Sequence, residues 1–123
     1  MSDMLRFRLG FAGWFLCAEL SLIHISFLDG EDSFLPGAKE FLQSIPKEDM
    51  IVFLTARTEY EKPHTLRFLR EKRVRYDHII FNAGRGERIL INDKKRDGLL
   101  TAFAVNTERD EFCKVKFVRD IER

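Results

Sequence analysis

A chain of 123 residues is long enough for one domain with a real hydrophobic core, and 45% apolar and 33% charged residues are ordinary for a globular protein. The 21 basic and 20 acidic side chains nearly cancel, which argues against a nucleic-acid partner or an anionic membrane and limits any anion site to a local cluster. Two widely separated cysteines, Cys17 and Cys113, do not suggest a disulfide framework, so we expect a cytoplasmic protein.

The first strand is expected within residues 4–11, which are apolar apart from Arg6 and Arg8. The ten uncharged residues from Leu9 to Ala18 also resemble the apolar core of a signal peptide. This run is too short to span a bilayer, and only a poor cleavage site follows it. We therefore favour a buried strand and its connection over secretion.

A hairpin or flap is expected next, because residues 15–28 are apolar and the pair Asp29-Gly30 that follows is a turn signal. Residues 36–45 predict a helix with Pro36 in its first turn, and Pro46 ends it.

Residues 50–57 form an apolar run that ends in Thr55, Ala56 and Arg57. Because the run is unbroken rather than alternating, it predicts a strand buried on both faces, in the middle of a parallel sheet. Thr55 would then lie at the carboxyl end of this strand, where open α/β sheets bind ligands. Thr55 could equally cap the next helix, and the two roles can coexist.

The remaining pattern alternates helix and strand. A helix is expected over 58–73, with Pro63 marking a kink or a late start. Short strands are expected at 78–81, 88–91 and 101–105. The pattern predicts an α/β fold, a three-layer sandwich with a mostly parallel central sheet. We expect one domain over 1–123, with a first strand and flap in 1–34, a core in 35–110, and a tail in 111–123 that adds an edge strand or stays loosely attached.

The candidate chemistry lies at the ends of the predicted strands. Asn92 and Asp93 follow the strand at 88–91, at the sheet edge predicted for Thr55. An aspartate there is often only a turn former or a helix cap. However, a hydroxyl from Thr55, a guanidinium from Arg85 and a carboxylate from Asp93 can together hold a phosphate and a magnesium ion. We expect these three side chains to converge.

Three segments together resemble the haloacid-dehalogenase-like phosphohydrolases, in particular small bacterial members with little or no cap. They are 53–57, 75–81 and 89–93, and the resemblance covers about 35–110. It implies a Rossmann-like core, with Thr55 as the phosphate-binding hydroxyl and Arg85 in place of the family's phosphate-binding lysine. It also implies that Asp93, with Asn92, holds magnesium.

The sequence departs from this family at the nucleophile. The family has an aspartate at the end of the first strand and a second aspartate two residues later, whereas Gly10 and Ala12 stand at the best counterpart here. A rival alignment makes Asp29 the nucleophile and Glu31 the general acid and base. Only four residues then separate Glu31 from the helix at Pro36, so we prefer the degenerate alignment and interpret 29–32 as a solvated turn.

These observations predict a catalytically impaired phosphatase-like domain, a pseudoenzyme that binds a small phosphorylated molecule or acts through a protein partner or a second copy. Magnesium binding would be weak or absent. The alternative is an active magnesium-dependent phosphohydrolase that acts on a small phosphomonoester. A third possibility is that the first thirty residues are an altered beginning to an otherwise ordinary family member.

Overall fold

The computed structural model describes the backbone of residues 5–10, 13–25, 32–108 and 115–120, and the side chains of 13–21 and 32–108. The elements are, in chain order, β1 (Leu5–Gly10), β2 (Phe15–Glu19), the 3-10 turn η1 (Leu20–Leu22), β3 (Ile23–Ile25), β4 (Asp32–Phe34), α1 (Ala38–Gln43), β5 (Met50–Leu54), the 3-10 turn η2 (Glu59–Glu61), α2 (Lys62–Glu71), β6 (His78–Ile80) and β7 (Val115–Asp120).

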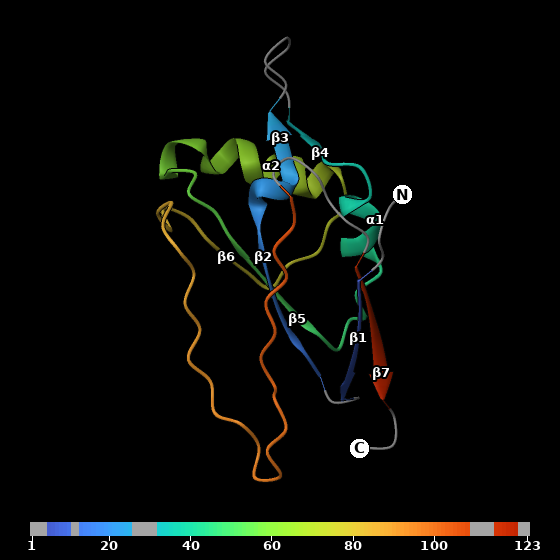
Figure 1. The fold of residues 1–123 in the computed structure, drawn as a ribbon. Coiled ribbons are helices and arrows are strands. Elements are labelled where there is room, and N and C mark those ends of the chain that lie inside the picture. The colour runs from blue at the N-terminus through green and yellow to red at the C-terminus, as the bar shows by residue number, and fades with distance from the viewer. Residues whose placement is uncertain (1–4, 11–12, 26–31, 109–114, 121–123) are drawn as a thin grey trace.

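A small parallel sheet with helices packed against it forms the centre of the molecule (Figure 1). Its strand order is β2-β5-β6, and both pairings are parallel. Phe15 pairs with Met50 at one end of the sheet, and Leu54 pairs with Ile80 near the other. The described residues therefore confirm an α/β fold with a parallel sheet.

The middle strand β5 is buried on both faces, as its unbroken apolar sequence predicts. Ile51 and Phe53, which share one face, have no exposed surface. Val52 points to the opposite face and is only 6% exposed. A strand of this kind cannot lie at the surface, and its central place in the sheet follows from its composition.

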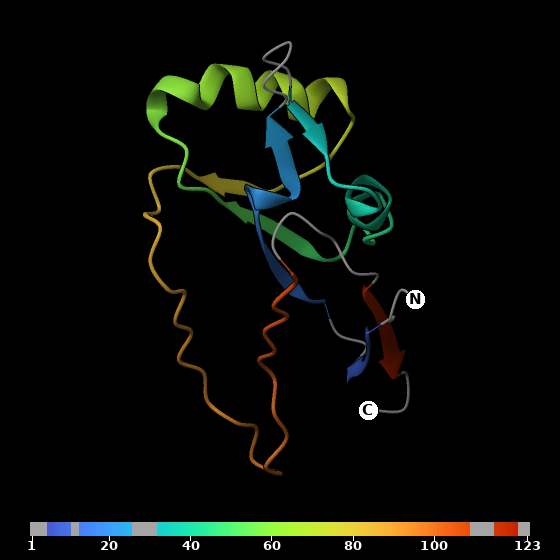
Figure 2. The same ribbon diagram turned by 45° about the horizontal axis from the view of Figure 1, so that its top comes forward.

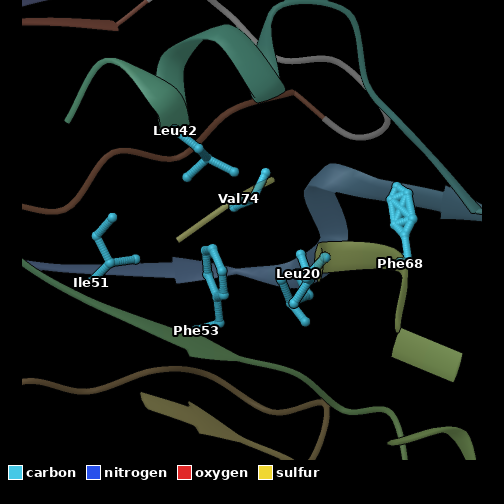
Figure 3. Packing of buried hydrophobic residues seen from close by; sticks show 7 residues of the cluster. Leu20, Leu42, Ile51, Phe53, Phe68 and Val74 are labelled. Carbon is cyan, nitrogen blue, oxygen red and sulfur yellow. The ribbon is translucent and has the colours of Figure 1, made fainter. Parts of the chain in front are cut away.

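The hydrophobic core lies between β5 and the two helices (Figure 3). Leu42 of α1 and Phe68 and Leu69 of α2 belong to the same buried cluster as Ile51 and Phe53. Figure 2 shows α2 lying across one side of the sheet.

The start of α2 confirms the late beginning that Pro63 predicted. The helix begins at Lys62, so the proline stands in the first turn, where its missing N–H breaks no helical hydrogen bond. Thr58 and Glu61 shape the 3-10 turn before it, since the Thr58 N–H donates to the Glu61 carboxylate at 3.1 Å.

The amino end of β5 is fastened to the residues before β2. The Trp14 N–H donates to Asp49 Oδ1 at 3.1 Å, and the Met50 N–H donates to the Trp14 carbonyl at 2.8 Å. A Cβ at Gly13 would lie 3.2 Å from the Glu48 carbonyl oxygen, so the backbone approaches closely at this glycine.

The amino end of β5 is also tied to the segment before β6. Asp77 accepts a hydrogen bond from the Ile51 N–H at 2.8 Å, and its own N–H donates to the Ile51 carbonyl at 2.8 Å. Arg75 supports this carboxylate at 3.1 Å. These bonds fix the register of the sheet before its carboxyl edge is reached.

The predicted first strand forms, but it does not join this sheet. β1 pairs in parallel with β7, from Leu5 opposite Val115 to Gly10 opposite Asp120, in a separate two-stranded sheet. The strand beside β5 is β2 instead. Residues 15–18 carry no charge, whereas β1 contains Arg6 and Arg8, and placing charged side chains beside the buried β5 would cost desolvation energy. Residues 115–120 of the tail form the strand β7, which pairs with β1 and not with an edge of the β2-β5-β6 sheet.

The strands predicted at 88–91 and 101–105 are wrong. Residues 82–108, which we call the arm, contain no helix or strand and extend from the end of β6 (Figures 1 and 2). The physical reason is the length of the connection. Seven residues separate Ile80 from Arg88, whereas a crossover between parallel strands needs a dozen or more.

The predicted hairpin is present as β3 and β4, which pair antiparallel with Ile23 opposite Phe34. The Asp29-Gly30 pair that was expected to turn between them lies outside the described residues. Neither helix in the described ranges is long and apolar enough to cross a membrane.

Candidate functional site at the carboxyl edge of the sheet

The carboxyl ends of the three parallel strands meet at one edge of the sheet. β2 ends there at Glu19, β5 is followed by Thr55, and β6 is followed by residues 81–87. Open parallel sheets bind ligands at this edge because the connecting loops there are free to vary. We therefore take this edge as the candidate site.

Thr55 is 4% exposed and is held by three hydrogen bonds. Its N–H donates to the Ile80 carbonyl at 3.0 Å, and its carbonyl accepts from the Ala83 N–H at 2.9 Å. Its Oγ1 accepts from the Arg57 N–H at 3.0 Å, which closes a turn two residues long. Thr55 therefore does not cap the next helix. Among the described residues its hydroxyl acts as an acceptor, from the Arg57 N–H.

The loop after β6 is folded around one guanidinium. Arg88 donates from Nη1 to the Ala83 and Gly86 carbonyls at 3.2 and 3.0 Å, and from Nη2 to the Gly84 carbonyl at 2.8 Å. Its Nε donates to the Glu19 carboxylate, so the same side chain joins this loop to the end of β2. Gly84 has φ of 75°, a conformation that glycine adopts without strain.

The direction of these carbonyls sets the direction of the neighbouring amides. In a trans peptide the N–H points opposite to the carbonyl of the preceding residue. Because the carbonyls of residues 83, 84 and 86 face Arg88, the N–H groups of Gly84, Arg85 and Glu87 point away from that guanidinium. Within the described part of the chain, no backbone carbonyl accepts from these three amides. The loop therefore presents several donors on its outer side.

A buried ion pair lies behind this edge. Arg57 donates from Nη1 to Asp32 Oδ2 at 2.8 Å and from Nη2 to Oδ1 at 3.0 Å. The Asp32 side chain is 1% exposed and that of Arg57 is 11% exposed. The pair joins the β3–β4 hairpin to the segment that follows Thr55. The interpretation of Asp32 as part of a solvated turn is therefore wrong, because its carboxylate is bound by a bidentate guanidinium and not by solvent.

Two residues of α2 contact this ion pair. Thr65, which is fully buried, accepts from Arg57 Nη1 at 2.9 Å and donates its hydroxyl to the Glu61 carbonyl at 3.0 Å. His64 Nε2 lies 3.4 Å from Asp32 Oδ2. Sequence reasoning did not find this cluster. The one available signal was a threonine on the apolar face of a helix, between Lys62 and Phe68.

No known protein family, curated protein or solved structure matches this chain.

The structure brings two of the predicted site residues to the same edge. Thr55 is bonded to the backbone of the loop that carries Arg85, and Arg85 is exposed. Asn92 and Asp93 lie in the arm, outside the sheet, and both are exposed. The Asn92 amide donates to the Thr101 hydroxyl at 2.8 Å and to the Asp93 carbonyl at 3.1 Å. Their expected placement failed because it required a strand at 88–91.

The structure describes only one of the residues that correspond to the catalytic aspartates in the two alignments. Gly10 ends β1 and pairs with Asp120, so it lies in the other sheet and not beside β5. Ala12 and the rival nucleophile Asp29 lie outside the described residues.

The residues proposed for magnesium do not form a suitable set in this structure. Magnesium requires near-octahedral oxygen ligands, whereas Asn92 and Asp93 are exposed in the arm, outside the sheet. Among the described residues no three acidic, histidine or cysteine side chains gather where they could hold a metal ion.

Cys17 reports on the charges at this edge. Burial raises the pKa of its thiol, the carboxylate of Glu19 raises it further, and the guanidinium of Arg88 lowers it. Because only the thiolate is nucleophilic, a raised pKa slows alkylation at neutral pH. We expect the alkylation rate of Cys17 by iodoacetamide, followed by peptide mass spectrometry, to reach half its maximum at a higher pH than for an unstructured cysteine peptide.

Two variants test how the charges of Glu19 and Arg88 change the pKa of Cys17. Glu19→Gln removes the anion, so the midpoint of the alkylation profile should fall. Arg88→Gln removes the cation, so the midpoint should rise. Equal midpoints in the parent protein and both variants would contradict this account of the electrostatics at the end of β2.

Proposed function

We propose that this chain is a phosphatase-like α/β domain that binds a phosphate group at the carboxyl edge of its sheet and has lost the aspartate nucleophile. The observation that carries the proposal is the loop folded around Arg88, which directs the amides of Gly84, Arg85 and Glu87 outward. Several backbone N–H groups that point outward from one loop favour an anion with several acceptor oxygens. The Arg85 guanidinium and the Thr55 hydroxyl supply further donors.

The proposal includes the layer arrangement of the core. We infer a three-layer core similar to that of the haloacid-dehalogenase-like phosphohydrolases, with the β2-β5-β6 sheet as its centre. A buried parallel β5 followed by Thr55 supports this inference. A cytoplasmic setting remains our expectation, supported by the cysteine usage.

The strand order changes which residues correspond to the nucleophile motif. Since β2 lies beside β5, the residue at the end of the first strand of the sheet is Glu19, and the residue two positions later is Ser21. The Glu19 carboxylate accepts from Arg88 Nε, and the Ser21 hydroxyl is a poor acid. Neither an available nucleophile nor a general acid therefore stands at these positions, which supports binding without turnover.

Phosphate binding is tested by titration with inorganic phosphate. We expect the amide NMR signals of Gly84, Arg85 and Glu87 to shift, and Arg85→Gln to weaken binding by about tenfold or more, because a hydrogen bond to a charged group contributes about 1.5–3 kcal/mol. Arg96→Gln in the arm removes the same charge away from the loop and is the matched control. An unchanged affinity in Arg85→Gln, or shifts confined to other residues, would refute the site.

Turnover distinguishes the proposal from its enzyme alternative. With p-nitrophenyl phosphate and magnesium we expect no phosphate release at enzymatic rates, which are typically about 1 s⁻¹ or faster. If such rates are found and Glu19→Gln abolishes them, Glu19 is an active acid and the chain is a phosphohydrolase.

A further inference from the structure

The arm carries large apolar side chains that face solvent. Three of them follow Arg88, in the half of the arm that leaves the sheet, and two follow Gly98, in the half that returns. They are Ile89 (85% exposed), Leu90 (74%), Ile91 (92%), Leu100 (56%) and Phe103 (47%). Several exposed apolar side chains in one segment are unusual on a protein surface and are typical of an interaction site. The β-branched Ile89 and Ile91 also favour an extended conformation.

The sheet offers an edge that fits such a segment. β2 is the end strand in the order β2-β5-β6, and in the described part of the chain only β5 pairs with it. Every second amide and carbonyl of β2 therefore points outward from the sheet. Phe15 at the start of this strand is 65% exposed, so an apolar side chain is already present beside the edge.

The arm is attached close to this edge. Arg88, which immediately precedes Ile89, donates to Glu19, the last residue of β2. The arm continues from the end of β6, and residues 81–87 lead from that strand to the Arg88–Glu19 contact at the end of β2.

We propose that the arm closes onto the open edge of β2 in the same chain, so that residues 89–91 add a strand to the sheet and their side chains are covered. The occupant is the chain's own arm because the Arg88–Glu19 bond already holds the residue before Ile89 at the carboxyl end of β2. An attached segment has a far higher effective concentration at this edge than a segment of a second molecule. Strand addition also satisfies the outward amides of β2.

Hydrogen exchange measured by mass spectrometry on the full chain tests this closure. In protein shown to be monomeric by light scattering, the outward amides of β2 and the amides of 89–91 should exchange about tenfold or more slowly than those of residues 95–98 at the tip of the arm. The double substitution Ile89→Asp with Ile91→Asp should remove this protection. Tyr60→Asp, at another exposed apolar residue (94% exposed), should leave it unchanged.

The amides of β5 serve as the folding control, since they should stay protected in all variants. If β2 in the parent protein exchanges as fast as the tip of the arm, the proposal is overturned whatever the variants do. Protection found only in a dimer would overturn it as well, and would assign the edge to a second copy. Protection that survives the double substitution would show that residues 89–91 are not the occupant.

Discussion

Replacing Arg57 by methionine is expected to lower the free energy of unfolding by about 3–5 kcal/mol, the usual cost of leaving a buried charge without its partner. Asp32 is the residue left behind, and its side chain is 1% exposed. Methionine keeps most of the volume of the arginine side chain, so the loss comes from charge and hydrogen bonds rather than from a cavity. Urea unfolding followed by circular dichroism measures the change.

Arg67→Met is the matched control for this prediction. Arg67 lies on α2 and is exposed, so the same substitution there should change stability by only about 0.5 kcal/mol or less. The double substitution Asp32→Leu with Arg57→Met should recover much of the loss, since apolar residues of similar size can replace a buried ion pair. If Arg57→Met costs no more than Arg67→Met, the ion pair does not stabilise the fold.

Replacing Phe53 by alanine should also cost about 3–5 kcal/mol, because it removes a large side chain from the centre of the core. Phe53 has no exposed surface, and its ring centroid lies 5.8 Å from that of Tyr76. Its neighbours in the cluster come from both helices (Figure 3). They cannot all move inward to fill the space, so a cavity should remain. The same urea titration measures this loss.

Tyr60→Ala provides the comparison for the core. Tyr60 is aromatic but 94% exposed, so its truncation should shift the urea midpoint only slightly. A similar loss in the two variants would mean that Phe53 is not part of a close-packed core. A changed slope of the unfolding curve in Phe53→Ala would instead indicate that the compactness of one of the two states has changed.

The elements predicted well are those whose sequence admits one explanation. An unbroken apolar run such as β5 is stable only inside a sheet, and a proline near the start of an amphipathic segment fixes where α2 begins. The position of Thr55 follows from β5 alone. Local sequence was sufficient in these cases because the deciding interactions are burial and backbone geometry.

The errors arose where the placement of a segment depends on contacts or connections that its own sequence does not contain. Residues 5–10 and 15–19 are both plausible strands, and only the position of the charges distinguishes which one can lie beside β5. Asp32 was placed in solvent because the sequence does not tell which arginine crosses to meet it. The arm was divided into strands because its apolar runs were judged without the length of the connection that must carry them.

The pairing of β1 with β7 has a consequence for the order of folding. Leu5 and Val115 are 110 positions apart, whereas Phe15 and Met50 are 35 apart. The entropy lost in closing a loop grows with the logarithm of its length, so bringing β1 to β7 costs about 1 kcal/mol more than bringing β2 to β5. The β2-β5-β6 sheet can therefore assemble before the two ends of the chain meet. On this account β1 and β7 join last and part first, while the edge that carries Thr55 stays intact.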